Sequence, residues 1–197
     1  MNAFTNEELS RFFAKIKFSS NPPRYEAVFS LALRYAMRIG EVSKIKMNDV
    51  DLVNKKISIR GEKNGRQRTY TLSDDLVKLL KTHLRRSEKL GVYLHCFDNK
   101  EYLFTNKRGG CLSTHSIWVE FHKICELANI EDKSPHAFRH TAGTTYAMQG
   151  KGIAEVANFL RHSNINSSLR YITLRDNYKE DSEMDEVFER MRKGEKK

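Results

Sequence analysis

Three side chains suited to binding an anion gather at the start of one predicted helix, which begins after Ser134-Pro135. With helical periodicity they share a face with Gly143, and they are His136, Arg139 and His140. The opposite face is the predicted core stripe, made of Phe138, Ala142, Thr145 and Met148. Because a helix start also presents backbone N–H groups and a favourable dipole, the polar face is suited to a phosphate. Taken alone, the cluster fits a solvated surface group equally well.

A second candidate for chemistry is Tyr171, which ends the stretch Leu160-Arg-His162-Ser-Asn-Ile-Asn-Ser-Ser-Leu-Arg-Tyr171. The tyrosine follows a polar turn and begins a new segment. A phenol can attack phosphorus once its proton is removed, although an ordinary pKa of about 10 makes it a poor nucleophile without a base. A tyrosine seen alone at such a position most often serves packing.

A basic β-hairpin is predicted earlier in the chain. Lys55 to Arg60 alternates as KKISIR, Asn64-Gly65 supplies the turn with positive φ, and Gln67 to Leu72 continues as the second strand. Residues 55 to 68 hold six basic side chains against one acidic side chain, Glu62. The six are Lys55, Lys56, Arg60, Lys63, Arg66 and Arg68. Such a hairpin is suited to contact phosphates, and a charged edge that only prevents aggregation is the alternative.

Helices account for most of the remaining chain. Thr5 to Glu8 match a capping box, so the first helix starts close to Met1. A second helix runs through residues 27 to 35, and a short one follows near Gly40. Further helices are predicted at about 73 to 90, 113 to 129, 134 to 149 and 153 to 160, with a short strand at 102 to 104. The fold class is therefore α+β and mostly helical, with a small antiparallel β-hairpin sheet.

The amino-acid composition indicates which kinds of molecule the protein can bind. The 197 residues include 35 Lys and Arg against 25 Asp and Glu, a formal net charge of +10. This surplus favours a polyanion such as nucleic acid, although a solvated basic surface has the same composition. Cys96, Cys111 and Cys125 form no C-x-x-C pair, which favours free thiols in a reducing cytoplasm. Neither a metal site nor a membrane-spanning stretch is expected.

Together and in order, these motifs resemble the tyrosine recombinase, or phage integrase, family. The family pattern is an arginine, a hairpin lysine, H-x-x-R, a second histidine and a nucleophilic tyrosine. Ala36-Met-Arg38-Ile-Gly-Glu41 is similar to the first arginine box, and His136-Ala-Phe-Arg139-His140 matches H-x-x-R-H. Lys63 stands in the hairpin in the place of the family's lysine, with Lys55, Lys56 and Arg66 as competing choices.

The remaining boxes lie near the nucleophile. Phe159-Leu-Arg-His162 resembles the family's L-G-H, with Arg161 where glycine is usual. Tyr171 falls nine residues after His162, which is the family's spacing. The resemblance covers about residues 5 to 175, and five boxes in order are more specific than any single one.

The resemblance implies the catalytic domain of a site-specific recombinase, which cleaves and rejoins DNA through a 3′-phosphotyrosyl intermediate without metal, ATP or other cofactor. The implied catalytic residues are Arg38, Lys63, His136, Arg139, His162 and Tyr171, with Glu41 and His140 in support. Two arginines can clamp the nonbridging oxygens bidentately, while His136 acts as general base and Lys63 as general acid. The predicted DNA contacts are Lys55, Lys56, Arg60, Arg66, Arg68 and Arg161.

Residues 1 to 177 are predicted to form the catalytic domain, and 178 to 197 a charged C-terminal helix or tail. The tail docks on a neighbouring protomer or packs on its own domain, and the sequence leaves both open. The expected partner is double-stranded DNA, on which the protein forms a homo-oligomer, a tetramer, from a chain that can be monomeric when free.

Family members usually carry a further N-terminal DNA-clamp domain, so the chain is either a fragment or a naturally short recombinase. Two other functions fit the same fold. A type IB topoisomerase uses a similar site to relax DNA, and a DNA-binding module can retain the fold without catalysis.

Overall fold

The computed structural model describes residues 3–60, 67–89, 101–106 and 109–177. The chain forms two compact units, Met1–Ala142 and Gly143–Lys197. The division falls inside one helix, α6 (His136–Met148), and each unit is described by itself. The described residues are mostly helical and include one small antiparallel sheet, which confirms the predicted fold class.

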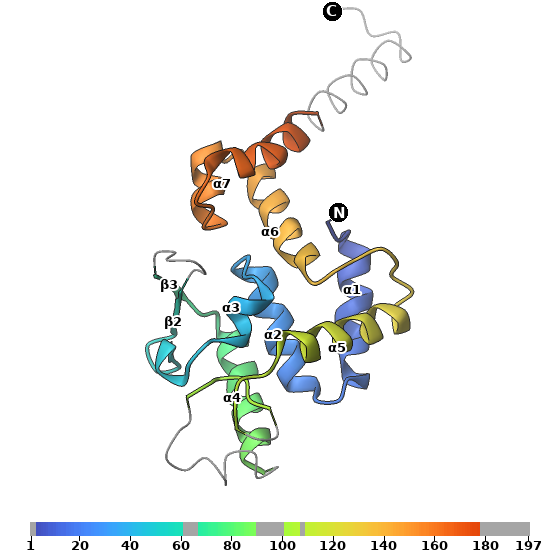
Figure 1. The fold of residues 1–197 in the computed structure, drawn as a ribbon, viewed down its shortest axis with the longest axis vertical. Helices are drawn as coiled ribbons and strands as arrows, with labels where there is room; N and C mark the ends of the chain where they lie inside the picture. Colours follow the sequence, from blue (N-terminus) through green and yellow to red (C-terminus); the bar gives the residue numbers. More distant parts are fainter. Residues whose placement is uncertain (1–2, 61–66, 90–100, 107–108, 178–197) are drawn as a thin grey trace, which may run out of the picture. The chain divides into compact units, whose positions relative to one another are not determined.

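The first unit holds most of the helices (Figure 1). They are α1 (Asn6–Lys15), α2 (Pro22–Arg34), α3 (Ile39–Ser43), α4 (Asp74–Lys89), α5 (Thr114–Leu127) and the start of α6, with short 3₁₀ turns η1 (Ile16–Phe18) and η2 (Met47–Asp49). Each was predicted as a helix from the sequence, apart from the two 3₁₀ turns.

The starts of these helices follow from local hydrogen bonds. The capping box is present at α1, where the Thr5 hydroxyl accepts from Glu8 N at 3.1 Å and the Glu8 carboxylate accepts from Thr5 N at 2.8 Å. At α5 the Ser113 hydroxyl accepts from Ser116 N at 3.0 Å. Pro22 and Pro23 begin α2, where the missing N–H groups have no intrahelical partner to lose.

The sheet has the order β1-β2-β3 and is antiparallel. Its strands are β1 (Val50–Asp51), β2 (Lys56–Ile59) and β3 (Arg68–Thr71), with Lys56 opposite Thr71 and Ile59 opposite Arg68. Ile57 and Ile59 point into the core while Lys56 is exposed, so alternation leaves the basic side chains on the outside. The two hairpin strands were predicted, whereas β1 was not.

The strand predicted at 102 to 104 is wrong. Tyr102 forms an isolated bridge with Lys46, and Thr105 forms another with Cys111. Leu103 N donates to Ile45 O, whereas Leu112 N donates to Phe104 O, so the segment changes partner within two residues. Leu103 and Phe104 are both fully buried, which breaks the alternation of a half-buried strand.

Phenylalanine rings form the centre of the first unit. Phe12 lies 5.1 Å from Phe29 and 5.2 Å from Phe138, and Phe4 stacks on Phe138 at 4.9 Å. Phe121 of α5 completes the cluster. These rings join α1, α2 and α5 to the first turn of α6, which carries the predicted phosphate-binding residues.

The second unit contains the end of α6, α7 (Ile153–Phe159), η3 (Ile165–Ser168) and a helical segment over 169–177. The core stripe predicted for α6 is correct for Phe138 and Ala142, which are buried, and wrong for Thr145 and Met148, which are exposed. The prediction is wrong for the part of the helix that belongs to the second unit.

A buried histidine makes the stability of the first unit depend on pH. His83 of α4 is fully buried, its Nε2 lies 3.0 Å from Leu103 O, and its ring lies 5.1 Å from the Phe104 ring. Burial lowers the pKa of His83 to about 4, against an ordinary value of about 6.5.

Because the unfolded chain takes up this proton first, stability should be lost as the pH falls from about 6.5 toward 4. We expect the free energy of unfolding to drop by about 2 kcal/mol from this group between pH 7 and pH 5. Urea unfolding at both pH values measures it, and His83→Gln should flatten the dependence. An unchanged slope in that variant would rule out His83 as the source.

Candidate functional site

Arg38 of the first arginine box is held by Glu41. Arg38 lies at the N-cap of α3, where its backbone N donates to Glu41 Oε2 at 3.0 Å. Its guanidinium Nη1 donates to Glu41 Oε1 at 3.2 Å. The Glu41 side chain is fully buried, whereas that of Arg38 is 31% exposed. One buried carboxylate therefore fixes the backbone and the head group of Arg38 while leaving the arginine open to a ligand.

Arg139 of the H-x-x-R box is buried, and it is hydrogen-bonded to Ala36 of the first arginine box. Its Nη1 donates to Ala36 O at 2.6 Å, across 103 positions of the sequence. Ala36 ends α2 with φ of 48°, and Met37 N donates to Ala32 O at 3.0 Å. This is a Schellman ending, in which a left-handed residue turns the chain after the helix. The turn brings the Ala36 carbonyl to Arg139.

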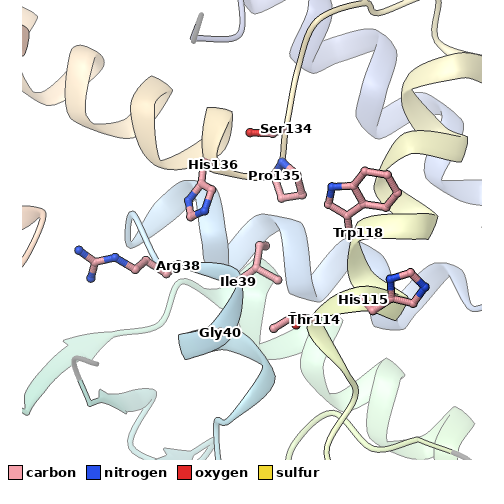
Figure 2. Close-up of a pocket in the computed structure, with 9 residues that line it drawn as sticks. All are labelled: Arg38, Ile39, Gly40, Thr114, His115, Trp118, Ser134, Pro135 and His136. Atoms are coloured by element: carbon pink, nitrogen blue, oxygen red, sulfur yellow. The ribbon is translucent and has the colours of Figure 1, made fainter. Parts of the chain in front are cut away.

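His136 opens onto a hollow of about 820 Å³ beside Arg38 (Figure 2). His136 is the first residue of α6 and is exposed, while Arg38 and Gly40 come from the start of α3. Figure 2 shows Arg38 and His136 toward one side of the hollow, with Trp118 and His115 of α5 toward the other. The hollow therefore joins a side chain of the first arginine box, Arg38, and one of the H-x-x-R box, His136, to an aromatic wall.

His162 and Tyr171 lie together in the second unit. His162 Nδ1 lies 2.7 Å from the hydroxyl of Ser168, which is fully buried. The imidazole ring stacks on the Tyr171 ring, with centroids 6.4 Å apart and planes 26° apart. The hydrogen bond at Nδ1 fixes the orientation of the imidazole ring.

The Tyr171 ring rests on Gly143 of α6. Tyr171 is 2% exposed, and a Cβ added at Gly143 would lie 2.8 Å from Tyr171 Cε1 and 3.1 Å from Leu160 Cδ1. Arg170 contributes a cation–π contact, with its Cζ 5.9 Å from the Tyr171 ring centre. Gly143 therefore provides the space that the tyrosine ring occupies.

Arg161, which stands where glycine is usual in the L-G-H pattern, has a left-handed backbone conformation. It follows α7 with φ of 54°, and it is preceded by the C-cap Leu160. Arg161 N donates to Asn158 O at 3.2 Å, and His162 N donates to Ala157 O at 2.9 Å. The turn before His162 is thus a second Schellman ending, kept in spite of the side chain.

The described basic residues of the hairpin lie in its strands or beside them. Lys55 pairs with Asp74 at 2.6 Å, and Arg60 lies 3.8 Å from Asp49. Lys56 is exposed on β2, and Arg68 begins β3. Lys63 and Arg66 lie outside the described residues. Surface ion pairs of this kind are weak, so Lys55 and Arg60 can exchange them for phosphates.

The structure therefore brings Arg38, Glu41, Arg139 and His136 together in one unit, and His162 and Tyr171 in the other. His140 is half-buried on α6, one residue after Arg139. Sequence reasoning missed the Ala36 carbonyl and Ser168, for which no residue pattern gives a signal. It placed Gly143 on the polar face without a role, although a glycine inside a helix is itself a sign of close approach.

The chain belongs to the phage integrase family, whose family model matches residues 2–178. A relative, the "Tyrosine recombinase XerC-like" protein of Caldanaerobacter subterraneus subsp. tengcongensis, is 28% identical over 88% of this chain and 50% of its own length. The "Type 1 fimbriae regulatory protein FimE" of Escherichia coli K12 is 25% identical over 85% of this chain and 83% of its own. The chain spans about half the length of the first of these.

Solved structures agree with the family. A crystal structure of XerA recombinase superposes with a TM-score of 0.73 at 25% identity, covering 91% of this chain and 65% of that one. The XerH site-specific recombinase bound to its difH substrate, a pre-cleavage complex, gives a TM-score of 0.72 at 25% identity, over 87% of this chain and 50% of that one. The fold is that of tyrosine recombinase catalytic domains.

Among the residues that the structure describes, no helix combines the length and the apolar composition needed to cross a bilayer. Over the same part of the chain, no group of three or more His, Cys, Asp or Glu side chains is arranged to hold a metal ion.

The left-handed conformation of Arg161 can be tested with two substitutions that delete the same side chain. Arg161→Gly should be more stable than Arg161→Ala by about 1 kcal/mol, because only glycine adopts φ near 54° without strain. Thermal unfolding of both variants measures the difference. Equal stabilities would mean that the turn before His162 rearranges when the side chain is lost.

Proposed function

We propose that this chain carries out site-specific DNA recombination, cleaving and rejoining strands through a 3′-phosphotyrosyl intermediate on Tyr171. At the level of the family it is a DNA recombinase, and the proposal adds the residues and their roles. The catalytic set is Arg38, Lys63, His136, Arg139, His162 and Tyr171, supported by Glu41 and His140. Residues 1 to 177 act as the catalytic domain.

The observation that carries the proposal is the bond between the two arginine boxes. Arg139 Nη1 donates to Ala36 O at 2.6 Å, two residues before Arg38, whose guanidinium Glu41 holds. Two arginines fixed in advance, beside an exposed histidine at a helix start, are suited to the charge that develops on a phosphodiester under attack. A merely solvated cluster does not require a buried guanidinium.

In the proposed cleavage step, Tyr171 Oη attacks the scissile phosphorus and the bond from phosphorus to the 5′-oxygen breaks. His136 accepts the phenol proton, and Lys63 protonates the departing 5′-oxygen, which leaves as a hydroxyl. Arg38, Arg139 and His162 donate to the nonbridging oxygens. The tyrosine stays joined to the 3′-phosphate, so the phosphoester bond is conserved without ATP.

Rejoining is the same step in reverse, with a 5′-hydroxyl from another strand as the nucleophile. Exchange between two duplexes needs several tyrosines, and we propose a homotetramer on double-stranded DNA, with residues 178 to 197 docking between protomers. The expected phosphate contacts are Lys55, Lys56, Arg60, Arg66, Arg68 and Arg161. The XerH structure, a recombinase held on its DNA substrate before cleavage, supports DNA as the partner.

Capture of the covalent intermediate tests the nucleophile. Nicked duplexes with randomised sequence around the nick release a short fragment after cleavage, so they trap the adduct and allow its DNA to be sequenced. We expect a denaturation-resistant adduct whose peptide contains Tyr171, and its loss in Tyr171→Phe, since phenylalanine has no oxygen to attack phosphorus.

The matched control is Tyr146→Phe, which changes a second tyrosine of the same unit that stacks on Phe159 at 4.4 Å. That variant should still form the adduct. An adduct that survives Tyr171→Phe would overturn the assignment, and relaxation of supercoiled plasmid without recombinant junctions would favour a topoisomerase.

DNA binding by this chain should depend strongly on salt, because phosphate contacts release counterions. With six contacts, from Lys55, Lys56, Arg60, Arg66, Arg68 and Arg161, the log-log slope of affinity against salt should be about −5.4. Lys56→Met should reduce the slope by about one unit. Fluorescence anisotropy at several salt concentrations measures it, and a slope near zero would contradict a phosphate-dominated interface.

A further inference from the structure

The segment that precedes α1 is bound to the start of α6. Phe4 N donates to the Thr141 hydroxyl at 2.8 Å, across 137 positions of the sequence. The Phe4 ring is 5% exposed and stacks on Phe138 at 4.9 Å, with planes 30° apart. A backbone bond and a ring stack therefore join residue 4 to two successive turns of the helix.

Lys133 makes a second connection, three residues before α6. Its ammonium Nζ donates to Ala3 O at 2.7 Å and lies 3.1 Å from Glu8 Oε2. The same nitrogen lies 5.6 Å from the centre of the Phe4 ring. The Lys133 side chain is only 7% exposed and that of Glu8 18% exposed, so this ion pair is shielded far better than a surface pair.

These contacts are made by residues that lie within three positions of His136 or Arg139, the residues proposed to bind phosphate. Thr141 Oγ1 also donates to Ala137 O at 2.8 Å, so the hydroxyl that receives Phe4 N braces the first turn of the helix. His136 and Arg139 belong to that turn and the next. Residues 3–8 thus hold the helix from its core side, while Arg139 reaches Ala36 O.

We propose that residues 3–8 form a strap that positions His136 and Arg139 for DNA cleavage, with Lys133 and Thr141 as its anchors on the α6 side. The inference rests on the proposed function. Lys133 and Thr141 are positioning residues, because they act through the helix that carries His136 and Arg139. A displacement of about 1 Å in such a helix is enough to slow a reaction on the order of 100-fold.

The test is single-turnover cleavage of saturating nicked DNA, measured well below the unfolding temperature of every variant. Lys133→Met removes the ammonium and keeps the length of the side chain. We expect its cleavage rate constant to fall about 10- to 100-fold, while the dissociation constant for DNA changes less than about threefold. Lys133→Arg should restore the rate to within about threefold, since guanidinium can bond both oxygens.

Thr141→Val is a milder variant that removes the acceptor for Phe4 N. Its control is Thr82→Val, because Thr82 Oγ1 donates to Lys78 O at 2.9 Å in the same helical arrangement but, among the residues that the structure describes, receives no bond from a distant segment. We expect a fall of about 10-fold in the cleavage rate for Thr141→Val and none for Thr82→Val. Circular dichroism confirms that each variant is folded.

Three outcomes would overturn the inference. A wild-type cleavage rate in folded Lys133→Met and Thr141→Val would show that the strap serves stability alone. A rate in Thr82→Val as low as in Thr141→Val would show the same. A pH profile that changes with Lys133→Met would mean that the lysine takes part in proton transfer itself. If the unsubstituted chain forms no adduct, the proposed function fails instead, and the two failures are thereby distinguished.

Discussion

The hydrogen bond from Arg139 to the Ala36 carbonyl is the constraint on which the half of the molecule proposed to bind phosphate depends. A guanidinium is costly to bury unless its N–H groups are bonded, and a bonded one cannot swing away when a ligand is absent. The bond also fixes the distance between α6 and the end of α2. The position of Arg38 then follows from that of Ala36, because only Met37 lies between them. Two boxes that are far apart in sequence become one site through a backbone oxygen.

Helix endings position the site residues in both units. Ala36 after α2, Asn129 after α5 and Arg161 after α7 all have positive φ, and each is followed by an N–H that bonds back into its helix. After α2 the bonded residue is Met37, which directly precedes Arg38. After α5 it is Ile130, which begins the segment that leads to His136, and after α7 it is His162 itself. A Schellman ending reverses the chain sharply at a defined residue, so the next side chain leaves the helix in a fixed direction. Left-handed alanine and arginine are each less favourable than glycine by about 1 kcal/mol, which the surrounding bonds must offset, whereas asparagine tolerates this conformation.

Most helices and the hairpin could be predicted from the sequence, because the patterns that indicate them act within a few residues. The capping box at Thr5, the cap at Ser113 and the alternation of Lys55 to Arg60 each act within a few residues, and the helices and hairpin they indicate are confirmed. The strand predicted at 102 to 104 is wrong because the pairing of this segment is divided between Lys46, far away in the sequence, and Cys111, six residues after Thr105. The burial predicted for Thr145 and Met148 is wrong, because periodicity does not reveal at which residue a helix passes from one compact unit into the next. The roles of Arg38, His136, Arg139, His162 and Tyr171 remain predictions, since order and spacing indicate them and chemistry must test them. The strap at residues 3–8 had no signal beyond a helix cap, because Lys133 and Thr141 meet it only through folding.

The spacing of nine residues between His162 and Tyr171 has a physical basis in the second unit. His162 leaves α7 through the turn at Arg161, and Asn164 then caps η3 by accepting from Asn166 N at 2.9 Å. Ser168, at the end of η3, holds His162 Nδ1 at 2.7 Å. The helix over 169–177 then points Tyr171 at Gly143 and stacks its ring on the same imidazole. One residue added after Ser168 would turn the tyrosine by about 100° around that helix and remove its ring from both contacts. The connector is therefore as specific as the residues that it joins, and it includes the left-handed turn that Arg161 makes directly before His162.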